Sequence, residues 1–93
     1  MFGLSNIIYE QIVKIARKYE YKFILFGSRA RGNYKANSDI DIAIVGECNE
    51  KTEYLIKNDF DLLDIPYQID IVFVKKGIKK ELQEAIEKEG VEI

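Results

Sequence analysis

The chain contains no histidine, and it has only one cysteine and one proline among its 93 residues. Without histidine, neither Ser-His-Asp catalysis nor a histidine-ligated zinc site can be built. The single cysteine, Cys48, excludes an internal disulfide and a thiolate metal site. Any chemistry must therefore use carboxylates, hydroxyl groups and metal ions.

Long apolar runs are also missing. No uninterrupted apolar run exceeds four residues, whereas a membrane-spanning helix needs about 20. No basic-then-apolar leader opens the chain, so a cytoplasmic location is expected. The net charge of −2 argues against a long nucleic acid as a stable partner, because such binders usually carry a basic surface.

The composition is that of an ordinary globular protein. Hydrophobic residues make up 47% of the chain and charged residues 32%, which fits neither a disordered segment nor a fibre. We expect one domain covering residues 1–93. A chain of this size buries roughly 60–65% of the surface that its unfolded form exposes, which is enough for a modest core.

Hydrophobic periodicity predicts an α/β fold with three strands. Ser5 or Asn6 is expected to cap the first helix and Asn49 a later one, while Gly32 ends a short helical turn in the left-handed conformation. Pro66 stops the helix before the last strand. Helices are expected at residues 7–19, 28–31, 50–63 and 78–89, and strands at residues 22–26, 39–45 and 67–74.

The stretch from Gly27 to Asp41 carries the strongest functional signal. A Gly-Ser turn follows one apolar strand, and after ten intervening residues Asp39 and Asp41 open the next. On a strand, these two acids point to the face opposite Ile40 and Ile42. Two neighbouring carboxylates repel each other unless a cation lies between them, so this pair predicts a divalent metal site rather than a charged edge strand.

A third acid, Asp70, lies inside the apolar run that follows Pro66. It alternates with Ile69 and Ile71 and should therefore point away from the buried face. If its strand lies beside that of Asp41, three carboxylates converge on one patch. Carboxylates hold Mg²⁺, and backbone N–H groups at a helix start hold phosphates, so the set is typical of phosphoryl transfer.

Basic residues gather around the Gly-Ser turn. Gly27 and Gly32 have the GxxxxG spacing of a P-loop, but Asn33 follows instead of the required lysine, so that motif is excluded. Arg29 and Arg31 are candidates for contacting phosphates, and either one could instead pack or pair at the surface.

The pattern Gly27-Ser28, ten residues, Asp39-x-Asp41 and a later strand with Asp70 resembles the nucleotidyltransferases of the DNA polymerase beta superfamily. It is most similar to the minimal nucleotidyltransferase group, the antitoxin partners of HEPN-type toxins. The resemblance implies a mixed sheet and a transfer of AMP from ATP. It further implies that the three acids bind two Mg²⁺ ions, that Asp70 is the general base, and that the Gly-Ser turn binds the nucleotide.

The acceptor is left open by the residues. The resemblance favours a tyrosine of a HEPN-type toxin as the acceptor hydroxyl. A second hypothesis is a small-molecule transferase, similar to aminoglycoside nucleotidyltransferases, that works as a homodimer. A third is a non-catalytic antitoxin that acts by binding alone, against which the complete set of three acids argues.

Overall fold

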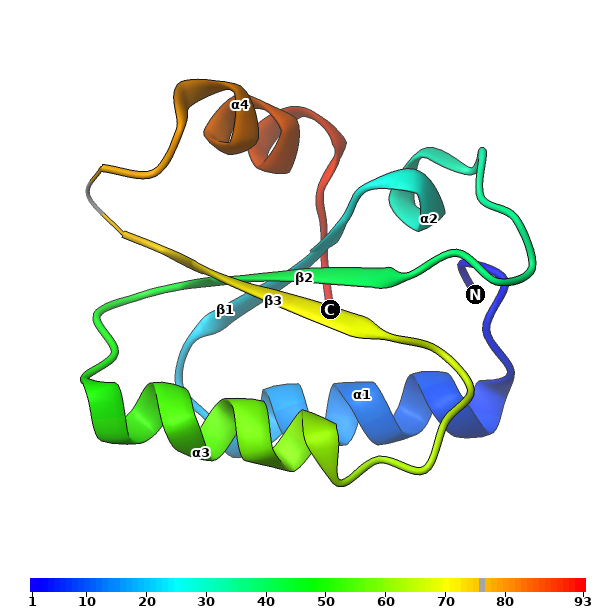
Figure 1. Ribbon diagram of the computed structural model, residues 1–93, viewed down its shortest axis with the longest axis horizontal. Helices are drawn as coiled ribbons and strands as arrows, with labels where there is room; N and C mark the ends of the chain where they lie inside the picture. Colours follow the sequence, from blue (N-terminus) through cyan, green and yellow to red (C-terminus); the bar gives the residue numbers. More distant parts are fainter. Residues whose placement is uncertain (76) are drawn as a thin grey trace.

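The computed structural model describes residues 1–75 and 77–93, and its helices lie on both faces of one sheet (Figure 1). The helices are α1 (Asn6–Lys18), α2 (Ser28–Arg31), α3 (Glu50–Asp61) and α4 (Lys80–Glu89). The strands are β1 (Lys22–Phe26), β2 (Ile40–Val45), β3 (Ile69–Val74) and β4 (Val91–Glu92). The predicted α/β class is confirmed.

The sheet has the strand order β3-β2-β1-β4. Strands β2 and β3 are parallel, and β1 pairs antiparallel with both β2 and β4, so the sheet is mixed. The prediction of three strands was one short, because Val91–Glu92 adds a fourth strand beside Ile24 and Leu25. Two residues are too few to show strand periodicity, and the chain reaches β1 directly after Gly90 ends α4.

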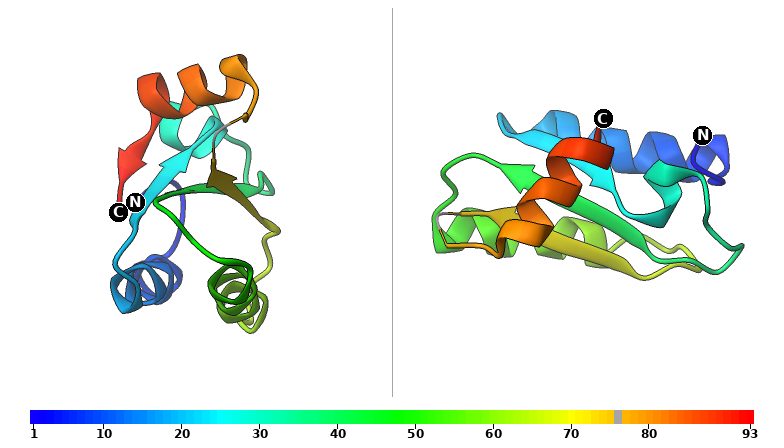
Figure 2. Two further views of the ribbon diagram at one scale, coloured as in Figure 1. Left: turned by 90° about the vertical axis from the view of Figure 1, so that its left-hand side faces the viewer. Right: turned by 90° about the horizontal axis from the view of Figure 1, so that it is seen from above.

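Helices α1 and α3 cover one face of the sheet, as the end-on view in Figure 2 shows. Ile40, Ile42 and Ile44 of β2 point to this face and are fully buried. They pack with Ile12 of α1 and Ile56 of α3. Each buried aliphatic side chain stabilises the fold by about 1.5–3 kcal/mol. This row of isoleucines fixes which face of β2 the intervening residues occupy.

Helices α2 and α4 lie on the opposite face (Figure 1). Ile86 of α4 packs on Phe26 and Ala43 in a second, smaller cluster, which also includes Val72 and Val74. This cluster involves the later part of β2 and β3. Asp41 and Asp70, the second residues of β2 and β3, therefore share a face with α4 but lie outside the cluster that α4 buries.

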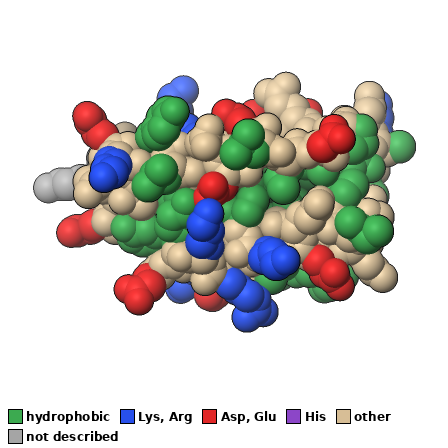
Figure 3. All heavy atoms as spheres, turned by 90° about the horizontal axis from the view of Figure 1, so that it is seen from below, with side chains coloured by type: hydrophobic (Ala, Val, Ile, Leu, Met, Phe, Trp, Pro, Cys, Tyr) green, Lys and Arg blue, Asp and Glu red, His purple; other side chains and the backbone are tan. Residues whose placement is uncertain are grey.

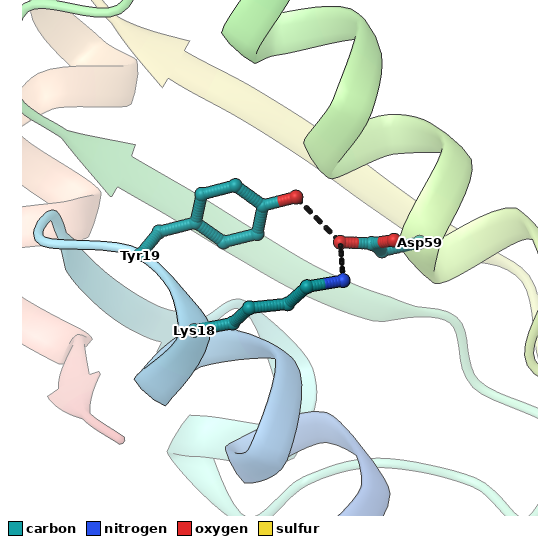
Figure 4. A network of polar contacts seen from close by, with 3 residues as sticks. All are labelled: Lys18, Tyr19 and Asp59. Carbon is teal, nitrogen blue, oxygen red and sulfur yellow. Dashed lines mark hydrogen bonds and ion pairs between the residues drawn. The ribbon is translucent and has the colours of Figure 1, made fainter.

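Helices α1 and α3 are also joined by polar contacts at their carboxyl ends (Figure 4). The Tyr19 hydroxyl donates a hydrogen bond to the Asp59 carboxylate, and Lys18 forms an ion pair with the same oxygen at 3.2 Å. Beside this network, a groove lies between the two helices on the face drawn in Figure 3. The groove is lined by Gln11, Lys14, Ile15, Lys18, Asp59, Leu62 and Leu63.

The predicted helix ends are mostly confirmed. The Ser5 hydroxyl accepts a hydrogen bond from the Ile8 amide at 3.2 Å, and Asn49 accepts one from Thr52 at 2.8 Å. Gly32 ends α2 with a left-handed φ of 88°. Among residues 1–75 and 77–93, we find no helix with both the length and the apolar character to cross a bilayer.

Candidate functional site

Asp41 and Asp70 meet on the face of the sheet that carries α2 and α4. Asp41 is the second residue of β2, Asp70 is the second residue of β3, and the parallel register places them directly opposite each other. Ile40 and Ile42, which flank Asp41, are fully buried on the other face, and Ile69 and Ile71, which flank Asp70, are partly buried against the same cluster. Both carboxylates are therefore forced onto this face. The expected convergence of Asp41 and Asp70 is therefore present in the structure.

Asp39 lies immediately before β2, which begins at Ile40, one residue later than the start at Asp39 that we expected for that strand. Its side chain is exposed. Its negative charge nevertheless acts on Asp41, where it helps to raise the pKa. Asp39 thus belongs to the same electrostatic site but is held less closely than the other two acids.

The pKa of the Asp41 carboxyl is raised above its ordinary value. Burial is the largest cause, followed by the negative charge of Asp70 and then that of Asp39. A hydrogen bond between the carboxyl groups of Asp41 and Asp70 acts in the same direction, and the nearby positive charge of Arg31 acts against it. The site therefore has an excess of negative charge that a bound cation would relieve.

The Gly27-Ser28 turn packs directly against Asp41. Gly27 has a φ of 78°, and a Cβ atom at this position would lie 2.3 Å from Asp41 Oδ2, so only glycine fits without a shift. Ser28 begins α2, whose first backbone N–H groups have no acceptor within the helix. Amide donors and a hydroxyl group thus stand next to a carboxylate pair, an arrangement suited to phosphate groups that are bridged by a cation.

Arg31 is the cationic residue of this site. It lies in the last turn of α2, and its Nη1 forms an ion pair with Glu89 of α4 at 2.9 Å. Its Nε donates a weaker hydrogen bond to Asn33 at 3.4 Å. The side chain remains 43% exposed. Arg31 is therefore accessible to a ligand and close enough to Asp41 to lower its pKa.

Arg29 occupies a different environment from the one that phosphate binding requires. Its side chain is 1% exposed. The guanidinium group donates to the backbone carbonyls of Phe2, Ala36 and Ser38 at 2.9–3.4 Å. The N–H donors of Arg29 are thus used by these carbonyls, whereas Arg31 is accessible to a ligand. We therefore remove Arg29 from the candidate nucleotide contacts.

Two further residues border the site. Gln68 Nε2 donates a hydrogen bond to Asp70 Oδ1 at 3.0 Å and so orients that carboxylate. Its position two residues before Asp70 could have indicated this, since residues at that spacing share a face of a strand. Glu89 pairs with Arg31 across 58 positions of sequence, and no local pattern indicates such a contact.

The site has the ligand types for a hard divalent cation, because it offers carboxylate oxygens and no soft donors. Electrostatics agree, since burial and then the negative charges of Asp70 and Asp39 raise the pKa of Asp41. In the part of the chain that the structure describes, however, no three acidic or cysteine side chains lie close enough together to form a ready metal-binding group. The oxygen ligands thus suit a divalent cation, although only Asp41 and Asp70 are paired and Asp39 lies apart from them.

Comparison with known families gives one match that covers most of the chain. The family model described as polymerase beta, nucleotidyltransferase matches residues 10–93. The chain is 35% identical over 57 residues to the probable protein adenylyltransferase MntA of Haemophilus influenzae, an alignment that covers 57% of this chain and 48% of that protein. The chain thus spans about half the length of this relative.

Solved structures show the same fold. A toxin–antitoxin crystal structure with AMP-PNP has a chain that matches with a TM-score of 0.67 and 24% identity, over 89% of this chain and 69% of that one. A chain of a mutant MntA–HpeT toxin–antitoxin structure matches with a TM-score of 0.66 and 22% identity, over 91% and 70%. At these identities the likeness establishes the fold.

Proposed function

The chain belongs to the polymerase beta nucleotidyltransferase family, and from that membership we propose that it transfers AMP from ATP to a hydroxyl group of a partner protein. The observation that carries the proposal is the register that sets Asp41 opposite Asp70 beside the Gly27-Ser28 turn. This arrangement supplies an acidic pair and phosphate-binding amides within one site. Such parts serve phosphoryl transfer, in which catalysis consists largely of positioning and electrostatic stabilisation.

The chain's own residues have distinct roles in this reaction. The amides of Gly27 and Ser28 and the Ser28 hydroxyl bind the β- and γ-phosphates, and Arg31 leaves Glu89 to neutralise them. The acceptor oxygen attacks the α-phosphorus, and the bond from that phosphorus to pyrophosphate breaks. Asp70, oriented by Gln68, accepts the proton of the attacking hydroxyl as general base.

We assign Mg²⁺ as the cofactor, in the form of two ions held by Asp39, Asp41 and Asp70. When bound, the metal supplies charge neutralisation at the triphosphate and lowers the pKa of the attacking hydroxyl. The raised pKa of Asp41 supports this assignment, because an unneutralised carboxylate is unfavourable there. Asp39 is exposed, so its side chain is free to turn toward the other two acids.

The acceptor we propose is a tyrosine of a HEPN-type toxin, and the cytoplasm, which supplies ATP, is the proposed compartment. Similarity to MntA, named a probable protein adenylyltransferase, supports a protein acceptor. The structural likeness to chains of toxin–antitoxin crystal structures agrees with a toxin partner. A small-molecule acceptor and inhibition by binding alone are the two alternatives that experiments must separate.

The test of transfer uses labelled ATP, Mg²⁺ and a HEPN-type toxin, for which the product of the adjacent reading frame is the first choice, with mass spectrometry of both proteins. We expect one or more AMP groups on a partner tyrosine. Asp70→Asn should retain its fold and lower the rate by roughly 10²–10⁴-fold, the range for loss of a general base. Asp64→Asn, an exposed acid outside the site, is the matched control. Absence of any AMP transfer with the wild-type chain would contradict the proposal.

A second experiment separates modification from inhibition by binding. The double variant Asp39→Asn and Asp41→Asn should abolish transfer while leaving the surface beyond these two side chains unchanged, so complex formation with the toxin should survive. Cells that carry the toxin and this variant should stop growing. Normal growth would show that binding alone silences the toxin, even if the wild-type chain transfers AMP in a purified reaction.

A further inference from the structure

Arg29 connects four separate segments of the chain around one buried guanidinium group. Its Nη1 donates to the Phe2 carbonyl at 2.9 Å, which fixes the segment before α1. Nε and Nη2 both donate to the Ser38 carbonyl, at 3.1 and 2.9 Å, and Nη2 also reaches Ala36. The rings of Tyr34 and Tyr67 lie 5.2 and 4.6 Å from the guanidinium carbon.

These contacts converge on the peptide bond that precedes Asp39. The Ser38 carbonyl belongs to that bond, and two of the hydrogen bonds from Arg29 hold it. Residues 33–39 have no helix or strand of their own. Ser38 otherwise closes only a local turn with Lys35, through its hydroxyl at 2.7 Å and its amide at 3.1 Å. Arg29 is thus the link between this loop and the body of the fold.

We infer that Arg29 is a positioning residue that sets the backbone of Asp39 relative to Asp41 and Asp70, and does not contact the nucleotide. The inference rests on the proposed function for the meaning of that position. Arg29 is the second residue of α2 and directly follows the Gly27-Ser28 turn. Its side chain therefore connects this turn to the loop that carries Asp39. In this way the backbone of Asp39 is held near the site although its side chain is exposed.

The chemistry of the arginine side chain is required at this position. A buried charge is costly unless its hydrogen bonds are satisfied, and here three carbonyl groups and two aromatic faces satisfy it. A lysine has a single ammonium group and no planar fork, so it cannot reach Phe2 and hold Ser38 through two donors at once. Arg29→Lys should therefore keep the charge and lose the positioning.

Hydrogen exchange in the metal-free protein tests the positioning without reference to activity. The amides of Ser38 and Ile40, which donate to Lys35 and Gln68, should exchange on the order of tenfold faster in Arg29→Lys. Amides inside α1 and α3 should be unchanged. Arg17→Lys, an exposed arginine on α1, is the matched control. Arg29→Met, which removes the charge as well, should give a larger effect at the same amides.

A double-mutant cycle then tests whether Arg29 acts through Asp39. With Mn²⁺ present, Arg29→Lys should weaken AMP-PNP binding by about 3–10-fold in the parent background. In the Asp39→Asn background the effect of Arg29→Lys should shrink to less than about twofold, because the group that Arg29 positions is gone. A residue that touches phosphate would instead weaken binding equally in both backgrounds and also in chelator.

The outcomes are separable. Faster exchange confined to the loop, with a cycle that is not additive, supports the inference. Uniform exchange changes across the chain, or equal losses of affinity in both backgrounds, overturn it. If the wild-type chain neither binds AMP-PNP with Mn²⁺ nor transfers AMP, the proposed function fails, and the exchange experiment alone decides whether Arg29 fixes the loop.

Discussion

Asp41 of β2 and Asp70 of β3 face each other across a parallel register that apolar neighbours enforce. The pairs on either side of them are Ile40 with Ile69 and Ile42 with Ile71. Slipping either strand by one residue would move its two isoleucines to the opposite face and take them out of the core in which they pack. The hydrophobic core therefore holds two like charges together, and the repulsion between them is a cost that folding without a cation must bear.

Replacing Asp41 with asparagine should stabilise the metal-free protein at neutral pH. The raised pKa of Asp41 means that the folded state binds its proton more tightly than the unfolded state. Stability therefore falls as the pH rises from the ordinary carboxyl pKa through the raised one, and asparagine removes that fall. In chelator at about pH 7 the melting temperature should increase by a few degrees, on the order of 2–5 °C.

Two comparisons check this sign. At about pH 3, where both forms of residue 41 are uncharged, the gain should disappear. Asp64→Asn, which alters an exposed acid away from the pair, should shift the melting temperature little in chelator. A gain of equal size at both pH values would mean that charge repulsion at Asp41 is not its cause.

Gly27→Ala should impair stability and activity more than backbone strain alone would, because the added Cβ atom also meets Asp41. Gly27 and Gly32 both have positive φ angles, of 78° and 88°, so alanine strains either position by about 1–2 kcal/mol. At Gly27 the new Cβ also meets Asp41 Oδ2 at 2.3 Å, whereas at Gly32 nothing lies within 4 Å. Gly27→Ala should therefore cost about 1–3 kcal/mol more in urea unfolding and abolish AMP transfer.

Gly32→Ala is the control for this comparison, because it introduces the same backbone strain without the contact. It should lower stability while retaining nucleotide binding. Equal losses of transfer in both variants would indicate that the backbone of α2, and not the close approach of Gly27 to Asp41, decides the activity.

Local patterns were sufficient to predict the helices, the strands β1 to β3 and the acidic pair. The alternation around Asp41 and Asp70 reveals their common face, since each is flanked by isoleucines that are buried or half-buried. The roles of Ser5, Asn49 and Gly32 follow from residue chemistry at helix ends, and the structure has each where the sequence predicts it.

The environments of the two arginines could not be predicted in this way. Arg29 and Arg31 are two residues apart in a four-residue helix, yet one is buried against Phe2 and the other pairs with Glu89. Both contacts join segments distant in sequence and depend on tertiary packing. The strand β4 was missed for the same reason, since its pairing with β1 is a consequence of where α4 ends.

Tyr19→Phe should destabilise the protein in a manner that depends on pH. Burial, and then the hydrogen bond to Asp59 and its negative charge, raise the pKa of Tyr19 to about 12. A raised tyrosine pKa contributes stability that is present below the ordinary value of 10.0 and is lost as the pH rises toward 12. Phenylalanine should cost about 1 kcal/mol near pH 8, and the difference should shrink above about pH 10.

The control for this titration is Tyr54→Phe, because Tyr54 is 67% exposed and its hydroxyl lies at the surface. Urea unfolding at a series of pH values should show little difference between that variant and the parent chain. If Tyr19→Phe were as stable as the parent at every pH, the Tyr19–Asp59 hydrogen bond would not contribute to holding α1 against α3.

Glu89→Gln should strengthen ATP binding. In the free protein Arg31 is paired with Glu89 at 2.9 Å, and both side chains are partly exposed, at 43% and 28%. A pair of this kind is worth at most about 1 kcal/mol, so releasing Arg31 to the phosphates should lower the Kd for ATP in Mg²⁺ by about 2–5-fold. Arg31→Gln should raise the Kd for ATP.

Calorimetry measures the Kd of both variants. The control is Glu53→Gln, which breaks the ion pair with Lys75 and should leave the Kd unchanged. If the Kd stays the same in Glu89→Gln and Arg31→Gln alike, Arg31 does not contact the triphosphate, and the amides of the Gly27-Ser28 turn must hold it without that help.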